Sequence, residues 1–294
     1  MKNPIMPSFS SWFLLLLFLY SQQALVTPQE VEDEREFDYV KESEKGPQHW
    51  GDLKEEWAAC RHGKLQSPID LLNKRVKVIP KLGDMKTNYR TANATIKNRG
   101  HDIAIQWIDD AGSIQINGTD YFLQQCHWHS PSEHSIKGTR FDLELHMVHQ
   151  TRDVKSKNSI AVVAAFYKIG HHSDHFLSKL AEDIDSITDT KEEIQKGMMD
   201  PRDLKTVIEF DPKELKMGGF KFYRYIGSLT VPPCTEGVIW TINRKIGTVS
   251  KEQVSMLKTA VHDFAEMNAR PLQPLNQREI HLYGPRSRRG NLRN

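Results

Sequence analysis

The chain has 294 residues, with 40 basic and 38 acidic side chains and a formal net charge of +2. This balanced charge excludes proteins that depend on a strongly basic surface, so we expect no nucleic-acid partner. The mean hydropathy of −0.58 excludes a protein built mainly from membrane spans, and the length allows one large domain or two small ones.

The N-terminus has the pattern of a secretory signal peptide over residues 1–24. A basic residue, Lys2, is followed by an apolar run at 12–20 and then by small and polar residues up to Ala24. The run is shorter than the roughly 20 apolar residues that a spanning helix needs, so we expect no membrane anchor; an uncleaved anchor is the alternative. Residues 25–36 are acidic and turn-prone, and they predict a disordered leader.

Short segments of alternating polar and apolar residues fill the chain from 76 to 163. Because Gly and Asn turns separate them, the pattern predicts a mainly β protein with a large antiparallel sheet. Strands are expected at 94–97, at 103–107, at 113–116, in the histidine-bearing segments 125–129 and 141–149, and at the buried run 159–166.

Helical patterns are few in the second half of the chain. We expect helices at 175–181 and at 251–258, where Ser250 is a residue type typical of an N-cap. We find no repeat and no internal linker, which indicates one domain of roughly 250 residues. The basic residues 284–294 predict a disordered tail.

Two of the strands carry histidines in a pattern typical of a metal site. Alternate side chains of a strand share a face, which places Gln125, His127 and His129 together, and Glu144 and His146 together. If the strands are neighbours, three imidazoles converge on one point, as zinc requires. Each strand also has an acceptor two residues before a histidine, and such an acceptor fixes the tautomer of a metal-binding imidazole.

A lone His-x-His is a weak signal, and its alternative is a pair of half-exposed strand histidines with ordinary polar contacts. A third histidine with an upstream carboxylate favours the metal site. The apolar stripe from Phe141 to Met147 marks the second segment as a core strand, whose other face still carries an acid and an imidazole. The other histidines are predicted to be structural (His134 and His149) or solvated (His171, His172 and His175).

Three cysteines in an oxidising compartment allow one disulfide and leave one thiol over. Cys126 lies on the face of its strand opposite the histidines, where a small buried thiol fits the core. We therefore predict a bridge between Cys60 and Cys234. The sequons at Asn93 and Asn117 are N-glycosylation acceptors in the same compartment.

A further informative stretch is 228–234, where two prolines lock a loop and hold Thr230 as a preorganised hydroxyl. Together with the histidine strands, the motifs along about residues 37–283 resemble those of the alpha-class carbonic anhydrases, above all the secreted plant members. The motifs are, in order, Gly46-Pro47-Gln48-His49-Trp50, Gln66-Ser67-Pro68-Ile69-Asp70, His127-Trp128-His129, Ser132-Glu133-His134, Glu144-Leu145-His146-Met147-Val148-His149, Gly227-Ser228-Leu229-Thr230-Val231-Pro232-Pro233 and Arg270-Pro271-Leu272-Gln273-Pro274-Leu275.

This resemblance implies a single catalytic domain with a large, twisted, mostly antiparallel sheet and short peripheral helices. It implies one Zn²⁺ per chain, held by His127, His129 and His146, and the reversible hydration of carbon dioxide to bicarbonate and a proton. In this family zinc hydroxide attacks the substrate carbon, because a His₃ site keeps a fourth position open for water. The resemblance also implies a secreted, apoplastic protein, or one that reaches the plastid stroma by the secretory route.

The resemblance assigns further roles residue by residue. His101 matches the proton-shuttle histidine, whose imidazole titrates near neutral pH. Thr230 matches the threonine that accepts a hydrogen bond from zinc hydroxide and donates one to a glutamate, and Glu133 matches that glutamate. Tyr39 matches, with looser spacing, a tyrosine that orders the relay waters. The apolar wall for carbon dioxide is matched by Val148, Val162, Leu229 and Trp240.

Val231 departs from the family pattern, because many members carry a hydroxyl or an imidazole at that position. Valine makes the side of the site that faces bicarbonate less polar. Product release and inhibitor preference are therefore expected to differ from those of other members, whereas the chemistry is expected to be the same. The family also implies the Cys60–Cys234 bridge, and it implies cis peptides at Ser67–Pro68 and Pro232–Pro233.

Two other functions stay open at this point. One is a storage or binding protein of the same fold with little or no catalysis, although the presence of all three histidines, Glu133 and Thr230 disfavours a version without metal. The other is a redox enzyme that uses Cys126, which is weakened because one thiol lacks a resolving partner if the other two are bridged. The sequence predicts neither the turnover rate nor the oligomeric state.

Overall fold

The computed structural model describes residues 30, 36–71, 76–79, 85–153, 155–188, 205–216, 221–261 and 267–284. The predicted signal peptide, and the predicted tail beyond residue 284, lie outside the described residues. Of the predicted acidic leader, only Glu30 and Glu36 are described. Glu30 makes two hydrogen bonds to distant side chains, which differs from the disorder expected for this segment.

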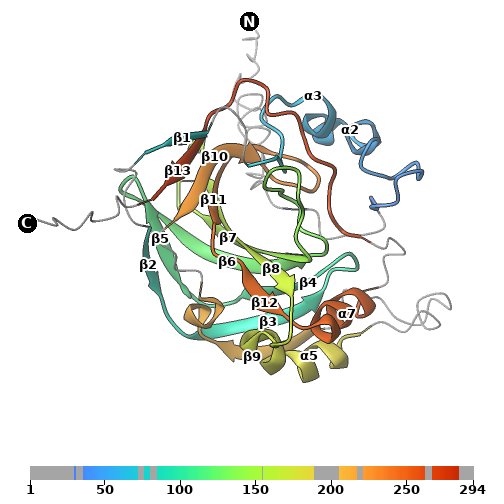
Figure 1. The fold of residues 1–294 in the computed structure, drawn as a ribbon, viewed down its shortest axis with the longest axis vertical. Helices are drawn as coiled ribbons and strands as arrows, with labels where there is room; N and C mark the ends of the chain where they lie inside the picture. The colour runs from blue at the N-terminus through green and yellow to red at the C-terminus, as the bar shows by residue number, and fades with distance from the viewer. Residues whose placement is uncertain are drawn as a thin grey trace, which may run out of the picture.

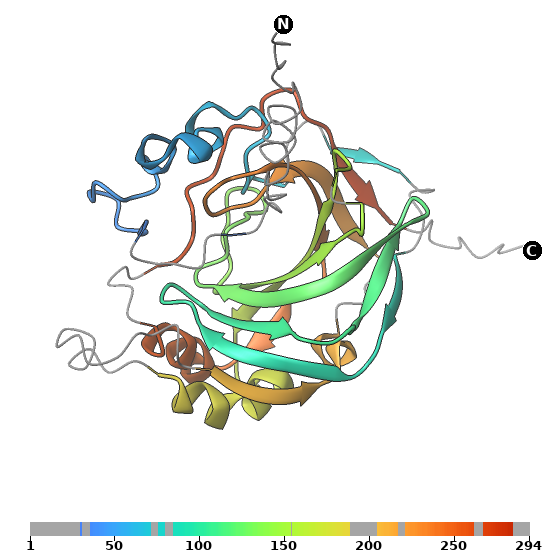
Figure 2. The same ribbon diagram turned by 180° about the vertical axis from the view of Figure 1, so that it is seen from behind.

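Thirteen strands form one sheet in the described part of the chain, in the order β1-β13-β10-β11-β8-β7-β6-β4-β3-β9, with β12, β2 and β5 attached off this path. The strands are β1 Val76–Val78, β2 Lys86–Tyr89, β3 Ala92–Asn98, β4 Ile103–Trp107, β5 Gly112–Ile116, β6 Thr119–His129, β7 Leu143–Gln150, β8 Ile160–Ile169, β9 Lys205–Phe210, β10 Phe222–Ser228, β11 Glu236–Asn243, β12 Gly247–Val249 and β13 Ile280–Tyr283. Among them only β1–β13, β8–β11 and β8–β12 pair in parallel, so the predicted, mostly antiparallel sheet is confirmed. The long strands curve strongly across the molecule (Figure 1 and Figure 2).

The helices are short and lie at the periphery of the sheet (Figure 1). They are α2 Trp50–Leu53, η1 Glu55–Trp57, α3 Ala59–His62, α4 His175–Lys179, α5 Ala181–Ser186, η3 Pro212–Leu215 and α7 Lys251–Thr259. Helix α7 begins after Ser250 as predicted, and the side chains of Ser250 and Gln253 each accept from the other's backbone N–H. The turns of helix between residues 50 and 62 were not predicted, because a single turn is too short to show apolar periodicity.

Strand β7 is buried on both faces, because it lies inside the sheet between two apolar clusters. Leu143, Leu145 and Met147 belong to one cluster, and Val148 belongs to the other. The predicted stripe is therefore confirmed over the strand itself, but Phe141 precedes the strand and packs in the second cluster. The polar side chains of β7 are surrounded by protein rather than by water, so each of them needs a partner.

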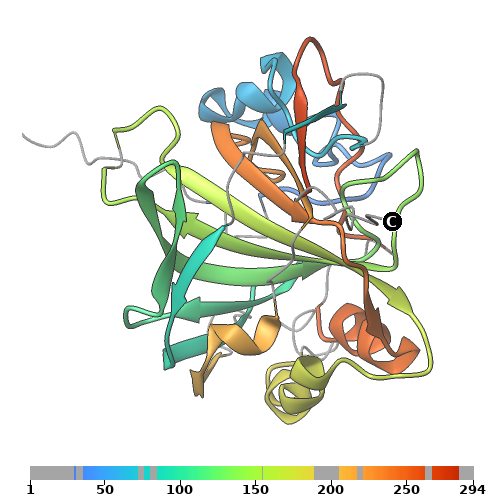
Figure 3. The same cartoon turned by 60° about the vertical axis from the view of Figure 1, so that its left-hand side comes forward.

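The pairing of β6 with β7 positions the histidines. His127 lies directly opposite His146, and His129 directly opposite Glu144. Strand β8 follows on the other side of β7 and pairs in parallel with β11. Figure 3 shows the hairpin of β10 and β11 running alongside β8. Segments 78 residues apart in the chain, in β8 and β11, therefore pair next to the histidine strands.

Candidate metal centre

Three buried imidazoles converge where β6 and β7 run side by side. His127 and His129 come from β6 and His146 from β7, and each residue is at most 1% exposed. Their ring centroids lie between 4.6 and 5.2 Å apart, and one nitrogen of each ring lies within 4.8 Å of the others. The Nε2 atoms of His127 and His129 are 3.0 Å apart, close to the roughly 3.3 Å that separates two ligands of a tetrahedral zinc ion.

Two of the rings are oriented by the acceptors predicted from the sequence. His127 Nδ1 donates to Gln125 Oε1 at 2.8 Å, and His146 Nε2 donates to Glu144 Oε1 at 2.9 Å. The nitrogen that remains on each ring, Nε2 of His127 and Nδ1 of His146, is the one available to a metal ion. Such outer hydrogen bonds fix the tautomer of a ligand histidine and raise its basicity.

The third ring is oriented by a residue that the sequence analysis missed. His129 Nδ1 donates to the backbone carbonyl of Asn268 at 2.6 Å. The side chain of Asn268 accepts from the N–H of Ser130 at 2.7 Å and donates to the carbonyls of His101 and Trp128 at 2.9 and 3.0 Å. A backbone carbonyl has no residue-type signature, so no motif could have indicated this contact across 139 positions.

The electrostatics of the site favour neutral rings at His127 and His146. Burial is the main cause that lowers the pKa of His127 well below its ordinary value, and the positive charge of Arg99 lowers that pKa further. Burial also lowers the pKa of His146, against the opposing effect of Glu144. Neutral rings at neutral pH are the form that metal ligation requires.

Glu144 connects His146 to a further buried histidine. Its Oε1 also accepts from His134 Nδ1 at 2.7 Å, its Oε2 accepts from the His134 backbone N–H at 2.8 Å, and His134 Nε2 lies 2.6 Å from the Tyr225 hydroxyl. Burial would raise the pKa of Glu144, but the two histidines outweigh burial and hold that pKa well below its ordinary range. His134, Glu144 and His146 also lie within ligand distance of one another. Because Glu144 already accepts three hydrogen bonds, the three-histidine group is the better metal site.

Glu133 is fully buried beside the cluster. Its Oε1 accepts from the backbone N–H of Arg270 at 2.9 Å, and its Oε2, without a hydrogen-bond partner in the described part of the chain, lies 3.6 Å from His129 Nε2. Thr230 is only 2% exposed, yet among the described residues no hydrogen bond joins it to Glu133. The Arg270 backbone holds one carboxylate oxygen, and the other oxygen faces the imidazoles, so the expected donation from Thr230 stays a prediction.

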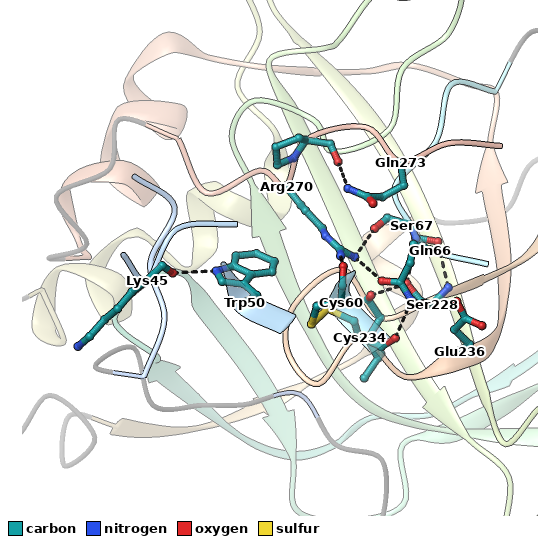
Figure 4. The surroundings of a disulfide bond; sticks show 12 residues. Lys45, Trp50, Cys60, Gln66, Ser67, Ser228, Cys234, Glu236, Arg270 and Gln273 are labelled. Atoms are coloured by element: carbon teal, nitrogen blue, oxygen red, sulfur yellow. Dashed lines mark hydrogen bonds between the residues drawn. A yellow bond between two sulfur atoms is a disulfide. The ribbon is translucent and has the colours of Figure 1, made fainter. Parts of the chain in front are cut away.

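The loop that carries Thr230 is held by bonds to distant segments. The Cys60–Cys234 disulfide joins it to α3, with Cα atoms 5.0 Å apart, which confirms the predicted pairing. Gln66 Nε2 donates to the Cys234 carbonyl at 3.1 Å, and the guanidinium of Arg270 donates to Gln66 Oε1 and to the Cys60 carbonyl, both at 2.8 Å. Figure 4 shows this network around the disulfide. A hydroxyl in the loop is therefore preorganised.

His101 and Tyr39 lie side by side but are enclosed. His101 is in the turn between β3 and β4, and it is 1% exposed, whereas a relay histidine is expected to reach water. Its ring lies 5.0 Å from that of Phe37 and 6.2 Å from that of Tyr39, and its Nε2 is 3.7 Å from Asp102 Oδ2. Tyr39 is 7% exposed and packs against Trp50. The structure therefore brings the two predicted relay residues together within the protein.

All four residues of the predicted substrate wall belong to one apolar cluster. They are Val148, Val162, Leu229 and Trp240. The Trp240 ring lies 4.8 Å from the His146 ring, so this cluster adjoins the imidazoles. Val231 packs instead in a separate cluster that contains the two bridged cysteines. The structure thus brings the four wall residues together, whereas Val231 lies in a different cluster.

The remaining predictions concern groups away from the imidazoles. Cys126 is a buried free thiol, and burial raises its pKa. Asn93 and Asn117 are both exposed, and Asn117 has a positive φ of 51° in the turn between β5 and β6. The expected cis peptides Ser67–Pro68 and Pro232–Pro233 are present, and Ser130–Pro131 is a third.

The donor set fits a tetrahedral divalent ion with one open position. Three imidazoles supply nitrogen ligands, and three rather than four protein ligands are typical of catalytic zinc. The unpartnered Oε2 of Glu133, next to His129 Nε2, is an acceptor for a proton-bearing group at this position. The apolar cluster beside His146 supplies a surface for an uncharged substrate.

Known proteins share both the sequence pattern and the fold. Residues 45–284 match the family model described as eukaryotic-type carbonic anhydrase. Alpha carbonic anhydrase 7 of Arabidopsis thaliana is 49% identical over 277 residues, which cover 94% of this chain and 95% of that protein. Carbonic anhydrase Nec1 of Nesocodon mauritianus is 47% identical over 282 residues, which cover 96% and 97%. Among solved structures, dioscorin complexed with ascorbate is 41% identical with a TM-score of 0.75, and the match covers 85% of this chain and 98% of that one.

Proposed function

The chain belongs to the eukaryotic-type carbonic anhydrase family, and on that premise we propose that it is a zinc enzyme that reversibly hydrates carbon dioxide to bicarbonate and a proton. The observation that carries the proposal is the convergence of three buried imidazoles whose outer nitrogens all donate to acceptors. In this proposal His127, His129 and His146 hold one ion per chain. The third acceptor comes from Asn268, which no motif of the family resemblance had pointed to.

Bound zinc supplies a Lewis acid that lowers the pKa of a water molecule to about 7, so that a nucleophile is available at neutral pH. The protein supplies orientation. Gln125 and Glu144 hold two of the ligand rings in place, which keeps the ligand nitrogens preorganised. Thr230, in the loop held by the disulfide, is the proposed hydroxyl that aligns the nucleophile. Glu133 Oε2 is the proposed acceptor for the proton of the Thr230 hydroxyl. The apolar cluster around Trp240 excludes water from the substrate side.

We assign export of the proton to His101, because an imidazole exchanges protons readily near neutral pH. Since the ring is enclosed between Phe37 and Tyr39, the relay requires its surroundings to open or its side chain to change rotamer. His101→Ala should lower the maximal hydration rate in dilute buffer, and added imidazole should restore it. Absence of this rescue would show that another group carries the proton.

The proposed function is tested by metal analysis together with stopped-flow hydration of carbon dioxide. We expect one zinc per chain, loss of hydration after treatment with a chelator, and recovery when zinc is returned. His129→Ala should reduce zinc affinity by more than the roughly 10- to 100-fold that loss of an outer hydrogen-bond partner costs. His175→Ala, at an exposed position in α4, is the matched control and should retain both zinc and activity. Stoichiometric zinc without hydration would reject the enzyme.

A storage or binding protein of the same fold is the second candidate, because a dioscorin structure is among the similar ones. The same measurements separate the two candidates. A catalyst hydrates carbon dioxide in proportion to its bound zinc, whereas a storage protein shows little hydration whatever its metal content.

We also propose that the chain enters the secretory pathway and is glycosylated at Asn93 and Asn117. The N-terminal sequence pattern, the Cys60–Cys234 disulfide and the exposure of both asparagines support this proposal. Among the residues that the structure describes, no helix combines the length and the apolar character needed to cross a bilayer. Deglycosylation should reduce the mass of protein from plant cells, and a fluorescent fusion should distinguish the apoplast from the plastid stroma. An unglycosylated protein that retains residues 1–24 would contradict the proposal.

A further inference from the structure

Glu30, in the predicted acidic leader, forms hydrogen bonds to two side chains next to the imidazole cluster. Its Oε2 accepts from Gln125 Nε2 and from Arg99 Nη1, both at 2.9 Å, and lies 3.9 Å from His127 Nδ1. The side chains of Glu30 and Arg99 are 7% and 4% exposed. This buried contact joins positions 95 residues apart, so local chain geometry does not explain it.

The outer partners of the three imidazoles differ in one chemical respect. Glu144 and the Asn268 carbonyl can only accept hydrogen bonds, so the rings bonded to them must present an N–H group. Gln125 carries an acceptor oxygen and a donor NH₂ of nearly the same shape. If the NH₂ faced His127, that ring would have to carry its proton on Nε2, and Nε2 could not then bind a metal ion.

Glu30 removes this ambiguity. A carboxylate only accepts, so it bonds the NH₂ of Gln125 and turns the amide oxygen toward His127 Nδ1. The ring proton is then held on Nδ1, and the lone pair of Nε2 faces the cluster. Arg99 in turn holds the carboxylate, because it only donates and is itself anchored to Asp102 through Nε and Nη2 at 2.7 and 2.6 Å.

We propose that Glu30 is a positioning residue that sets the tautomer of His127 for metal binding by fixing the orientation of Gln125. The inference rests on the proposed function, because it concerns the ion that the three histidines hold. It gives a residue next to the predicted signal peptide a part in assembling the metal site, although Glu30 lies outside the family motifs.

The test compares Glu30→Gln with Glu36→Gln in protein expressed from residue 25 onward. Both variants replace a carboxylate by an amide, but Glu36 is a half-exposed partner of Lys54, at 2.6 Å, on the surface. For E30Q we expect about tenfold weaker zinc binding, measured by competition with a chelator, which is the low end of the range for partners of metal ligands. E36Q should bind zinc as the wild type does.

A second readout follows the ring itself in metal-free protein. Nitrogen-15 NMR of histidine-labelled wild type should show His127 with its proton on Nδ1, and E30Q should show a mixture of the two tautomers. The exchange variant E30Q/Q125E should recover most of the lost zinc affinity. In this variant position 125 carries the carboxylate, which can only accept a hydrogen bond from His127. Position 30 carries the amide, which can donate to that carboxylate, and the net charge is unchanged.

Each outcome decides the inference. Weaker zinc binding and mixed tautomers in E30Q, with recovery in the exchange variant, support it. Equal zinc affinity in E30Q and the wild type overturns it while the proposed function stands. Weaker zinc binding in E30Q without recovery in the exchange variant would mean that Glu30 only supports the structure around the site, and this result also overturns the inference. A wild type that holds no zinc overturns both this inference and the proposed function.

Discussion

His127 and His146 lie directly opposite each other in the ladder between β6 and β7, with ring centroids 5.2 Å apart. Backbone hydrogen bonds of two strands inside the sheet therefore set the separation of these imidazoles, which is more precise than placement on loops. His129 faces Glu144 in the same ladder. The ladder therefore sets one histidine of β6 opposite a histidine of β7, and the other opposite the carboxylate that orients that histidine. The loop of Thr230 must then be fitted to this rigid cluster, and its disulfide and side-chain bonds serve that purpose.

Thr230→Val should reduce hydration far more than Thr230→Ser. Valine keeps the size of the side chain but removes the hydroxyl, whereas serine keeps the hydroxyl. Since loss of one oriented hydrogen-bonding group costs about 10²- to 10³-fold in rate, we expect about a 100-fold lower kcat/KM for T230V and a much smaller loss for T230S. Stopped-flow hydration measures both. Zinc content should stay at the wild-type level, and equal rates in the two variants would remove the hydroxyl from the mechanism.

Much of the fold could be predicted because strand alternation is a local signal. The segment 103–107 is β4 within the same bounds, and the capping box of Ser250 marks the start of α7. The order of the strands could not be predicted in this way, since β8 lies beside β11 only through pairing of segments far apart in sequence. The same limit applies to the single helical turns between residues 50 and 62, which are too short for a periodic pattern.

In the site, too, residues close in sequence to the histidines could be predicted, and residues far from them could not. Gln125 and Glu144 were predictable because each stands two residues before the histidine that it orients. Asn268 and Glu30 were not predictable, because they reach the cluster across 139 and 95 positions, the former through a backbone atom. Burial of His101 was missed for a related reason, since exposure depends on which distant segments pack over a turn.

His149 should make folding stability decrease when the pH falls below about 6.5. The residue is fully buried, with Nε2 2.8 Å from the Tyr89 hydroxyl, and burial lowers its pKa from 6.5 to about 4. The folded state therefore favours the neutral ring. Its contribution is complete above pH 6.5, is lost as the pH falls from 6.5 toward 4, and changes little below 4. The two pKa values correspond to about 3 kcal/mol of unfolding free energy.

Urea unfolding of metal-free protein at several pH values between 4 and 7.5 measures this contribution. His149→Gln keeps a neutral hydrogen-bonding side chain that does not titrate, so its stability should depend less on pH in that range. The lowered pKa values of His127 and His146 act in the same direction, but they are present in both proteins and cancel in the difference. An unchanged pH dependence in H149Q would show that His149 has the same pKa in the folded and unfolded states, which would contradict the lowered folded pKa.

Cys126 should resist alkylation in the folded protein. Its side chain is fully buried, and burial raises the pKa of its thiol, so little of the reactive thiolate is present at neutral pH. Iodoacetamide followed by mass spectrometry should leave Cys126 unmodified in native protein and modify it after denaturation. Rapid modification of the native protein would restore the redox enzyme as a candidate.

Asn268→Asp should damage the metal site more than Asn268→Ala. The amide Nδ2 donates to the carbonyls of His101 and Trp128 at 2.9 and 3.0 Å. An aspartate oxygen at this place can only accept, so it would face these two carbonyl oxygens with no hydrogen bond and would be repelled by them. Alanine removes these bonds without repulsion, and the carbonyls of two buried residues lose this partner, at about 1–3 kcal/mol each. In both variants the Asn268 backbone carbonyl that orients His129 remains, and only its position is disturbed.

The size of that disturbance is measured by zinc affinity and by the free energy of unfolding. We expect about tenfold weaker zinc binding for N268A and a loss nearer 100-fold for N268D, within the range for partners of metal ligands. Asn276→Asp is the matched control, because this exposed asparagine also donates to a backbone carbonyl, that of Lys64 at 2.7 Å, away from the histidines. If N268D and N268A bound zinc equally, the side chain of Asn268 would have no part in placing the carbonyl, and the segment at 267–270 would be held by its other contacts, among them the bond from Arg270 to Glu133.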